Sequence, residues 1–420
     1  MTDRALVLVE SNTTGSGRLF CAAARRLGLR PVVLARDPGR YPYLAADAVD
    51  SRRVDTGSID AVLAAVDALD VPAAGITSSS EYFIATAGAA ARRRGLPHVD
   101  PDAVRACRDK GRQRAALAAA GVPVPGFVPA ADVEAAVAAA NRIGLPVVCK
   151  PVAGSGSVGV RLCLSPAEVR RAAAAVLHDD PAVLGLPPQT GVVVERYVAG
   201  PEYSVEMFDD RVVAVVRKHL GPEPHFVETG HDVPAALTDR AAQRLGAVAS
   251  QAVRALGLGW GPAHVELRDA PTGAVIIEVN PRLAGGMIPR AVEAATGADL
   301  VTATVARAAG LPFDLTPTGG RTAPDAPGAA VIRFLVADRP GRLLAVDGVE
   351  AARGLPGVVD VGVLREPGSD LVLRHSFQDR LGYVIAVGRE PVAAGRRANA
   401  ALAALRFAVG PVPDVLTLGR

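Results

Sequence analysis

The chain has 420 residues, of which 50% are hydrophobic and only 4% are aromatic, and its formal net charge at pH 7 is +3. This length exceeds one ordinary domain and allows a substantial core, which the composition predicts to be built of alanine, valine and leucine. The small charge argues against a dedicated nucleic-acid surface. No uninterrupted apolar stretch reaches membrane-spanning length and the first residues run into a predicted strand, so we expect a cytoplasmic protein without membrane or nucleic-acid partners. The four cysteines show no CxxC spacing and lie mostly in apolar runs, which indicates buried, reduced thiols.

The first hundred residues alternate buried-type strands with helices rich in alanine and arginine. This alternation predicts a small parallel sheet and therefore an α/β domain of Rossmann-like topology. Of the glycines of a dinucleotide-binding turn, only Gly15 and Gly17 follow the first strand, so we expect no NAD site. The predicted strands cover 5–11, 30–36 and 73–79, and the predicted helices cover 18–27, 58–69 and 82–95.

A loop rich in glycine and serine follows a predicted strand that ends at Lys150. Glycine lets backbone N–H groups approach an anion closely, and consecutive N–H groups form a concave phosphate-binding nest. The loop is not a Walker A motif, because no GK[ST] sequence closes it and no helix evidently follows. We interpret it as a mobile lid over phosphates, with Lys150 as a fixed positive charge beneath; a flexible surface hairpin is the alternative. The lid residues are Gly154, Ser155, Gly156, Ser157, Val158 and Gly159.

Two predicted strands joined by a short connection come next. The first strand ends at Glu195, the connection carries Arg196, Tyr197 and Val198, and the second strand contains Glu202. An adenine ring needs an apolar slot with backbone donor and acceptor groups, and a ribose needs a carboxylate for its hydroxyl groups. A strand edge followed by an acidic residue supplies both, so this segment is a candidate nucleotide-binding hinge.

Glu266 and Glu278 lie on two apolar-alternating strands that a short DAPTG turn separates, which is the signature of a hairpin. Residues of equal parity on neighbouring strands can face the same side, so the two carboxylates can project together. They repel each other unless a cation lies between them, and Mg²⁺ usually binds through one or two carboxylates together with substrate phosphates. We predict a metal site here; two solvated glutamates on an exposed sheet face are the alternative.

The hairpin leads into the sequence NPRLAGGMIP, where a basic residue and a glycine pair precede a helical stretch. Arg282 can hold a carboxylate or a phosphoryl oxygen bidentately. Gly285 and Gly286 can present backbone N–H groups to an anion, although a tight turn would also explain them.

In this order, the motifs of about residues 1–325 resemble those of the ATP-grasp superfamily of carboxylate–amine ligases. The spacing of twelve residues between the two glutamates, followed by Asn-Pro-Arg, is the most specific part. The resemblance implies that the chain binds ATP and Mg²⁺, or Mn²⁺ in its place. It also implies that the metal ligands are Glu266, Glu278 and Asn280.

The same resemblance assigns the nucleotide site. A lysine before the central domain of the family matches Lys110, and the strand-end lysine and the glycine-rich lid match Lys150 and 154–160. The adenine-contacting hinge matches residues 195–198, and the ribose-binding acid matches Glu202, seven residues after Glu195.

Within the superfamily, the pattern is most similar to the L-amino acid ligase branch, where an F-x-E-x-G-H-x-x-P segment lines the amino-acid pocket. This chain has that pattern from Phe226 to Pro234, after a strand that ends near Lys218. We expect Glu228 to bind a substrate ammonium from a loop and His231 to orient it or accept a proton. A surface loop with ordinary histidines is the alternative. The predicted catalytic residues are Lys218, Glu228, His231 and Arg282, and the predicted substrate-binding residues are Glu228, His231, Arg282, Gly285 and Gly286.

These parts predict an ATP-dependent ligase that forms an amide, such as a dipeptide or an amino-acid conjugate, from small-molecule carboxylate and amine substrates. A carboxylate held near Arg282 would attack the γ-phosphoryl group, and the lid would protect the acylphosphate from water. An amine would then displace phosphate, while Arg282 and the amides of Gly285 and Gly286 stabilise the oxyanion. An ATP-grasp carboxylase, a nucleotide-biosynthesis-type ligase and a regulatory protein without catalysis are the alternatives. We also expect a homodimer.

The predicted architecture is a mixed α/β ATP-grasp fold. A Pro/Gly/Thr-rich segment at 310–330 is interpreted as a linker. Beyond it, three apolar segments predict a small mixed sheet and a final helix at 390–406. The predicted parts are a Rossmann-like domain at 1–100, linking helices at 101–122, a lid subdomain at 123–196, a metal-bearing core at 197–325 and a mixed α/β C-terminal subdomain at 326–420.

Overall fold

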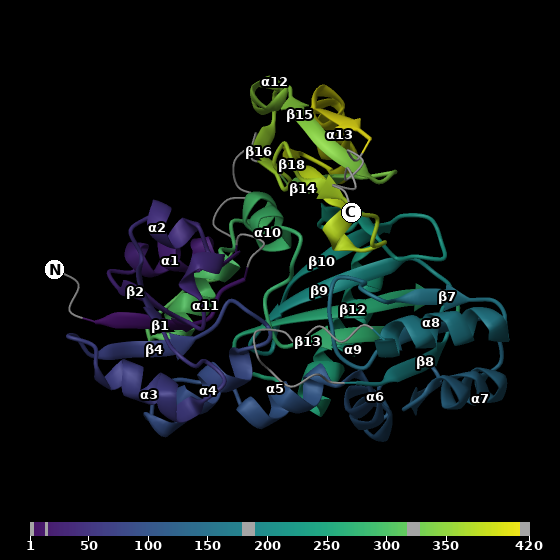
Figure 1. Ribbon diagram of the computed structural model, residues 1–420, viewed down its shortest axis with the longest axis horizontal. Coiled ribbons are helices and arrows are strands. Elements are labelled where there is room, and N and C mark those ends of the chain that lie inside the picture. Colours follow the sequence, from purple (N-terminus) through teal and green to yellow (C-terminus); the bar gives the residue numbers. More distant parts are fainter. Residues whose placement is uncertain (1–3, 13–15, 179–189, 317–327, 412–420) are drawn as a thin grey trace, which may run out of the picture.

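The computed structural model describes residues 4–12, 16–178, 190–316 and 328–411, which form four sheets and the helices that cover them (Figure 1). The N-terminal sheet has the order β3-β2-β1-β4, and β1 pairs in parallel with both β2 and β4. The predicted Rossmann-like topology is therefore confirmed. Its strands are β1 (Ala5–Val9), β2 (Arg30–Ala35), β3 (Asp50–Arg53) and β4 (Ala73–Thr77). Its helices are α1 (Ser16–Arg26), α2 (Tyr43–Ala46), α3 (Ile59–Asp67) and α4 (Ile84–Arg93), with a 3₁₀ turn η1 (Pro38–Arg40).

A helix from much later in the chain, α11 (Leu300–Ala308), completes this N-terminal unit. Its residues Val301 and Val305 belong to the hydrophobic cluster that contains the β1 side chains. Gly75 in β4 permits the contact, because a Cβ there would lie 2.2 Å from the carbonyl oxygen of Ala308. The sequence does not indicate that α11 packs against the N-terminal strands. This contact connects the N-terminal unit to the part of the chain that forms the central sheet.

Two short helices, α5 (Pro101–Arg108) and α6 (Lys110–Ala119), connect the N-terminal unit to the rest, as predicted. Asp109 separates them, since its side chain accepts a hydrogen bond from Arg112 N and caps α6. The break places Lys110 at the first position of α6.

The lid subdomain is an antiparallel sheet of order β5-β8-β6-β7. Two alanine-rich helices pack on it and bury small residues such as Ala139 and Ala173. The glycine-rich loop joins β6 to β7. The elements are β5 (Phe127–Ala130), α7 (Val133–Ile143), β6 (Val147–Pro151), β7 (Arg161–Cys163), α8 (Pro166–His178) and β8 (Val192–Arg196).

The central sheet has eight strands in the order β13-β12-β9-β10-β11-β14-β18-β16. Alternation along β9 decides what each face carries: Tyr203, Val205 and Met207 enter the hydrophobic cluster with α9, and Glu202 and Glu206 point to the other face. The first five strands are β9 (Glu202–Phe208), β10 (Arg211–Leu220), β11 (Glu228–Val233), β12 (Pro262–Ala270) and β13 (Gly273–Asn280). The helices of this part are α9 (Asp239–Ala255), α10 (Ile288–Thr296) and α11.

The three strands predicted to form a separate small mixed sheet instead extend the central sheet, and that prediction is wrong. β14 pairs antiparallel with β11, β18 with β14, and β16 with β18. Apolar alternation identifies a strand but not the sheet edge that it joins, and the open edge of β11 supplies the partner. The strands are β14 (Ala329–Val336), β16 (Val358–Val363) and β18 (Arg380–Gly388).

A further antiparallel sheet of order β17-β15-β19 lies beyond the central sheet, at the top of Figure 1. The predicted final helix is present as α13, which packs on β14 and β18. The remaining elements are β15 (Gly341–Asp347), α12 (Val349–Arg353), β17 (Asp370–Leu371), η2 (Phe377–Asp379), α13 (Pro391–Ala404) and β19 (Arg406–Gly410). Part of the predicted linker at 310–330, with the boundary at 326, lies outside the described residues, and the predicted domain division stays a prediction.

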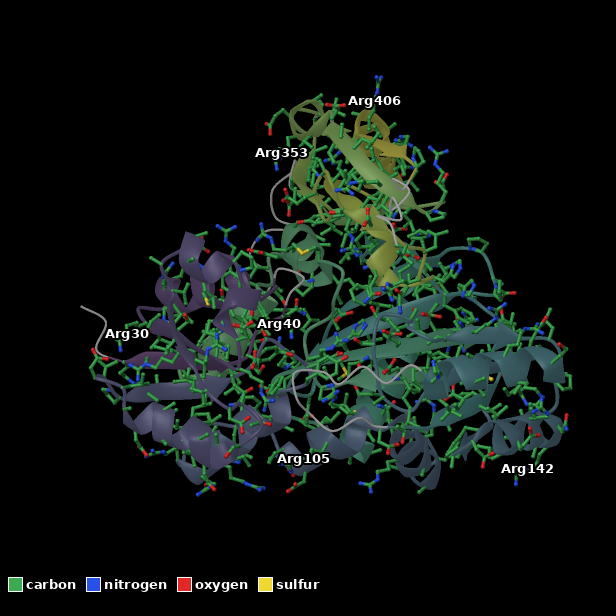
Figure 2. The ribbon with its side chains drawn as sticks, in the orientation of Figure 1. Arg30, Arg40, Arg105, Arg142, Arg353 and Arg406 are labelled. Atoms are coloured by element: carbon green, nitrogen blue, oxygen red, sulfur yellow. The ribbon has the colours of Figure 1, made fainter. Side chains whose placement is uncertain are left out.

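Exposed arginines lie on several separate parts of the molecule. Arg142 on the lid subdomain and Arg353 and Arg406 on the C-terminal part are exposed and lie at the periphery in Figure 2. The four cysteines are buried and unpaired, as predicted. Within the described ranges, no helix has the length and apolar character that crossing a bilayer requires. The predicted homodimer and cytoplasmic location stay predictions.

Candidate active site

The polar face of the central sheet forms the floor of a cleft of about 2510 Å³ between the N-terminal unit, the lid and the C-terminal strands. Backbone register brings the predicted residues together on this floor: Glu266 lies opposite Glu278, and Lys218 lies opposite Glu202. The prediction that the hairpin presents both glutamates side by side is confirmed.

Lys218 is the centre of this polar floor. Its Nζ lies 2.9 Å from Glu202, 2.9 Å from Glu228 and 2.8 Å from Glu266, and the residue is 4% exposed. Burial acts to lower the pKa of Lys218, but the three carboxylates hold it well above its ordinary value. The cation therefore persists at neutral pH and joins the predicted ribose, amino-substrate and metal carboxylates into one cluster.

His264 is a member of this cluster that the sequence analysis missed. Its Nδ1 lies 2.9 Å from Glu206 and its Nε2 lies 2.9 Å from Glu266. Burial acts to lower the pKa of His264, yet the two carboxylates raise it to about 9. In the sequence, only its equal parity with Glu266 on β12 indicates that His264 faces the site. Otherwise His264 resembles an ordinary histidine in an apolar strand.

The predicted metal ligands fit Mg²⁺ as an open site. Glu266 and Glu278 supply carboxylate oxygens and Asn280 ends the same strand as Glu278, which is the hard donor set that Mg²⁺ prefers. Among the described residues, no three histidine, cysteine or acidic side chains gather as a ready-made cage. Substrate phosphates would therefore complete the coordination. In this structure side-chain cations neutralise both glutamates, Lys110 at 3.0 Å from Glu278 and Lys218 at 2.8 Å from Glu266.

The two predicted phosphate lysines lie beneath the lid. Lys110 Nζ donates to the carbonyl oxygen of Gly154 at 2.9 Å, so it connects the lid to Glu278. Lys150 is buried in β6 and forms an ion pair with Glu195 at 2.5 Å. Burial lowers the pKa of Lys150.

The lid itself is held from two sides. Gly154, Gly156, Ser157 and Gly159 have positive φ angles, which explains the glycine content of the turn. Ser157 Oγ donates to the carbonyl oxygen of Phe226 at 2.8 Å. Phe377 from the C-terminal part donates its N–H to the Gly156 carbonyl at 3.2 Å. The C-terminal part therefore contacts the lid directly, whereas lid mobility stays a prediction.

The hinge residues lie where the sequence places them, at the end of β8 and in the connection to β9, and several of them have partners within the protein. The Glu195 carboxylate is buried between Lys150 and Arg114, the latter at 2.8 Å. Arg268, which the sequence analysis missed, donates to the Val198 carbonyl at 2.8 Å and to Glu202 at 2.9 Å. Glu195 therefore anchors Lys150 and Arg114, and the adenine-contact role of the hinge stays a prediction.

The amino-substrate segment corrects one prediction, because Glu228 and His231 lie on strand β11 and not on a loop. Glu228 forms ion pairs with Lys218 at 2.9 Å and with Arg380 at 2.7 Å. His231 is fully buried, and neither ring nitrogen has a hydrogen-bond partner among the described residues, although its Nε2 lies 3.7 Å from Glu228. Burial lowers its pKa to about 3. The sequence ETGHDV lacks the apolar alternation of a strand, so a loop was predicted. The segment is extended because it pairs with β10 on one side and with β14 on the other.

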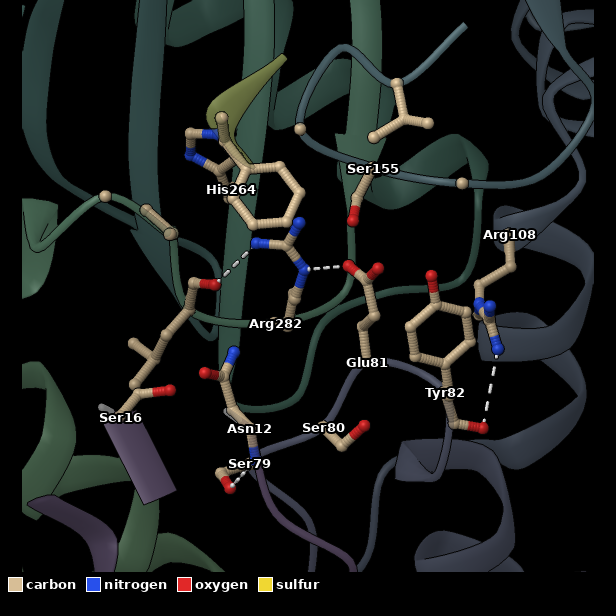
Figure 3. A pocket seen from close by; sticks show the side chains of 18 of the residues that line it. Asn12, Ser16, Ser79, Ser80, Glu81, Tyr82, Arg108, Ser155, His264 and Arg282 are labelled. Carbon is tan, nitrogen blue, oxygen red and sulfur yellow. Dashed lines mark hydrogen bonds and ion pairs between the residues drawn. The ribbon is translucent and has the colours of Figure 1, made fainter. Parts of the chain in front are cut away.

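Arg282 meets the N-terminal unit (Figure 3). Its Nε donates to Glu81 at 2.6 Å and its Nη1 donates to the Leu283 carbonyl at 2.9 Å. Burial acts to raise the pKa of Glu81, but Arg282 and Ser155 of the lid hold it below its ordinary value. Figure 3 shows Ser155, Glu81 and Arg282 converging from the lid, the N-terminal unit and the core. Glu81 was not predicted, because the segment after β4 carries no recognisable motif.

Gly285 and Gly286 lie just before α10, near the pocket of Glu228 and His231. Gly286 has a φ of 58°, and a Cβ there would lie 3.2 Å from His231 Nε2 and 3.4 Å from Arg380 Nη1. Their predicted role in oxyanion stabilisation stays a prediction.

Comparison with known proteins identifies the family. Residues 143–290 match the model of the ATP-grasp domain, and residues 333–410 match the model of the L-amino acid ligase C-terminal domain 2. The chain belongs to the ATP-grasp superfamily, as a carbon–nitrogen ligase of the L-amino acid ligase type. Its fold is accordingly the mixed α/β ATP-grasp fold that the resemblance implied.

Three similar proteins illustrate the relationship of this ligase. It is 39% identical to the uncharacterized protein y4rH of Sinorhizobium fredii, over 98% of this chain and 84% of that protein. It is 32% identical to carnosine synthase 1 of Gallus gallus, over 79% of this chain but only 38% of that longer protein. The crystal structure of an L-amino acid ligase from Bacillus licheniformis superposes with a TM-score of 0.79 at 21% identity, over 98% of this chain and 100% of that one, which shows the shared fold.

Proposed function

We propose that this ligase joins the carboxyl group of an amino acid to an amine through an acylphosphate, giving a dipeptide or a similar amide with ADP and phosphate. The observation that carries the proposal is the position of Lys218, which contacts Glu228 of the amino-substrate segment and Glu266 of the metal pair at once. A substrate whose ammonium approaches Glu228 therefore lies close to the metal carboxylate Glu266.

The nucleotide would be held by the residues beneath the lid. ATP-grasp enzymes use ATP with a divalent metal ion, and bound Mg²⁺ supplies charge neutralisation at the phosphates. Lys110 and Lys150 add fixed positive charge, and the lid amides can donate to phosphate oxygens. The lid is hydrogen-bonded to the Phe226 carbonyl and to the Phe377 N–H, which holds it at the cleft, where it can shield an acylphosphate from water.

Arg282 and Glu81 would act in the transfer of the acyl group to the amine. Among the described residues, Arg282 Nη2 has no hydrogen-bond partner, so it can donate to the acyl oxygen as negative charge develops there. Glu81 is held ionised by Arg282 and Ser155 and can accept a hydrogen bond from the incoming ammonium. The protein thus positions both reactants and stabilises charge, which is its main task in phosphoryl and acyl transfer.

A phosphate-release screen across pairs of amino acids, with mass spectrometry of the products, tests the proposal. We expect phosphate release that requires a carboxylate substrate and yields a stoichiometric amide in the presence of an amine. The Glu278→Gln enzyme, purified identically, controls for contaminating ATPase activity. Phosphate release that depends on bicarbonate alone, or the absence of an amide from every pair, would refute the proposal.

A further inference from the structure

The segment of the C-terminal part that leads into β18 touches the lid. Phe377, the first residue of η2, donates its backbone N–H to the Gly156 carbonyl at 3.2 Å. The ring of Phe377 lies directly on the lid backbone, because a Cβ at Gly156 would lie no more than 3.1 Å from three of the ring carbons. Gly156 also has a φ of 65°, a conformation that other residues rarely adopt. The C-terminal part therefore contacts the lid through a backbone hydrogen bond and through an aromatic ring.

The turn that carries Phe377 is fixed by its own hydrogen bonds. Ser376 and Asp379 form a capping box, and Ser376 is fully buried. The Asp379 carboxylate also accepts a hydrogen bond from Arg374 N at 2.8 Å. The Asp379 carbonyl accepts one from Ala337 N at 2.8 Å, just beyond the end of β14. The central sheet thus supports the turn, and the turn supports the ring on the lid.

A second contact connects this turn to the other support of the lid. The ring of His375 stacks on the ring of His225, with centroids 3.9 Å apart and an angle of 5° between the planes. His225 precedes Phe226, whose carbonyl accepts the hydrogen bond from Ser157 Oγ of the lid at 2.8 Å. The two segments that hold the lid therefore also hold each other.

The amino-substrate site lies three residues beyond Phe377 on the same segment. Arg380 donates from Nη2 to Glu228 Oε2 at 2.7 Å. Phe377 and Arg380 both line the cleft, as does Gly156. The contact between Phe377 and the lid therefore lies where the nucleotide lid meets the amino-substrate site.

The composition of the lid explains why such a contact matters. A loop of glycine and serine buries little apolar surface of its own, so contacts from outside the loop decide how readily it opens. If the lid opens before the amine reacts, water displaces phosphate from the acylphosphate. That reaction regenerates the free carboxylate and consumes ATP without forming an amide.

We propose that Phe377 is a positioning residue that holds the lid closed until the amine has reacted with the acylphosphate. This inference rests on the proposed ligase function and adds to it the protection of the intermediate. It also gives the C-terminal part a role at the active site that the motifs of residues 1–325 do not contain.

Phe377→Ala tests the proposal, because it removes the ring and keeps the backbone N–H. In the wild-type ligase we expect the molar ratio of phosphate released to amide formed to be near unity. In Phe377→Ala this ratio should rise at least about threefold, because water reaches the acylphosphate. A merely structural defect would lower both products together, so an unchanged ratio would overturn the proposal.

The matched control is Phe407→Ala, at a partly buried phenylalanine of β19 that packs on the cluster around α13. It loosens the same C-terminal part without touching the lid contact, so its ratio should equal that of the wild type. An equal rise in Phe407→Ala would show that general loosening, and not the ring on Gly156, causes the loss. Phe377→Leu keeps an apolar side chain without a flat ring and should shift the ratio in the same direction by less.

Hydrogen exchange distinguishes this inference from the proposed function, because it requires no amide. With Mg²⁺ and a non-hydrolysable ATP analogue, the amides of residues 154–159 should exchange at least about tenfold faster in Phe377→Ala than in the wild type and in Phe407→Ala. If no pair of amino acids gives an amide and exchange still rises, the proposed function fails and the positioning role of Phe377 stands. Unchanged exchange over 154–159 would refute the inference alone.

Discussion

Glu228→Gln is the sharpest test of the amino-substrate pocket, because it removes one charge and keeps the shape of the side chain. In the wild-type ligase burial acts to raise the pKa of Glu228, but Lys218, Arg380 and His231 hold it well below its ordinary value. Glu228 is therefore ionised at neutral pH and can accept a hydrogen bond from a substrate ammonium.

The magnitude follows from the contacts of Glu228. Its two oxygens contact Lys218 at 2.9 Å and Arg380 at 2.7 Å, and its side chain is 20% exposed. Glutamine keeps one acceptor oxygen and turns an NH₂ group toward the second cation, so one charge-assisted hydrogen bond is lost, worth about 1.5–3 kcal/mol. The same loss applies to the substrate ammonium and corresponds to about a tenfold to hundredfold decrease in affinity.

Steady-state kinetics in the amino substrate, paired with calorimetric titration of ADP and Mg²⁺, measures the contrast. We expect the amino-substrate KM to rise by that factor and the nucleotide affinity to change by less than the KM does, because Glu228 reaches the ribose and metal carboxylates, Glu202 and Glu266, only through Lys218. Glu350→Gln, at an exposed glutamate of α12, is the matched control. An equal loss of nucleotide affinity, or unchanged kinetics for every amino substrate, would refute the assigned role of Glu228.

Three further predictions concern the metal site, the lid and the ion pairs that join β11 to β10 and β14. Glu278→Gln should lower phosphate release at saturating Mg²⁺ by at least about a hundredfold with an unchanged circular dichroism spectrum, because a ligand charge is lost; near-normal release would contradict the assignment. Residues 154–159 should exchange amide hydrogens more slowly with an ATP analogue and Mg²⁺ than without, and equal protection in both states would contradict a lid. Asp232→Asn should lower the free energy of unfolding at pH 7 by about 1–3 kcal/mol, because Asp232 lies 2.8 Å from both His219 and Arg333. Burial acts to raise the pKa of Asp232, but these partners hold it below its ordinary value, so the difference should shrink as the pH falls from 6 to 3 and the carboxylate is protonated; a constant difference would show that the carboxylate charge is not involved.

Local patterns predicted the elements that carry the site. Alternation in HVEL and VIIEVN predicted the hairpin, and equal parity predicted that Glu266 and Glu278 face one side, which the register confirms. The glycine content of the lid agrees with its positive φ angles. The linking helices and the Rossmann-like strands also follow from period and capping, which depend on neighbouring residues along the chain.

Partners from distant segments were not predictable in the same way. Arg380 and Glu81 are 152 and 201 residues away from the groups they bind, Glu228 and Arg282. Each is one arginine or glutamate among many, and nothing adjacent to it in the chain marks it as part of a site. His264 and Arg268 share a strand with Glu266, but their partners Glu206 and Glu202 come from β9, which the sequence does not place beside β12.

The sequence by itself determined the ATP-grasp motifs, their order and the parity that places the metal carboxylates on one face, because these depend on spacing along the chain. Only the tertiary structure decided that β14, β18 and β16 extend the central sheet, that Glu228 and His231 are on a strand, and that Arg380 enters the cleft. The physical reason is that a sheet edge offers its backbone groups to any strand of suitable length, and the pairing depends on packing of the whole chain. That packing in turn decides which charged side chains from distant segments come into contact.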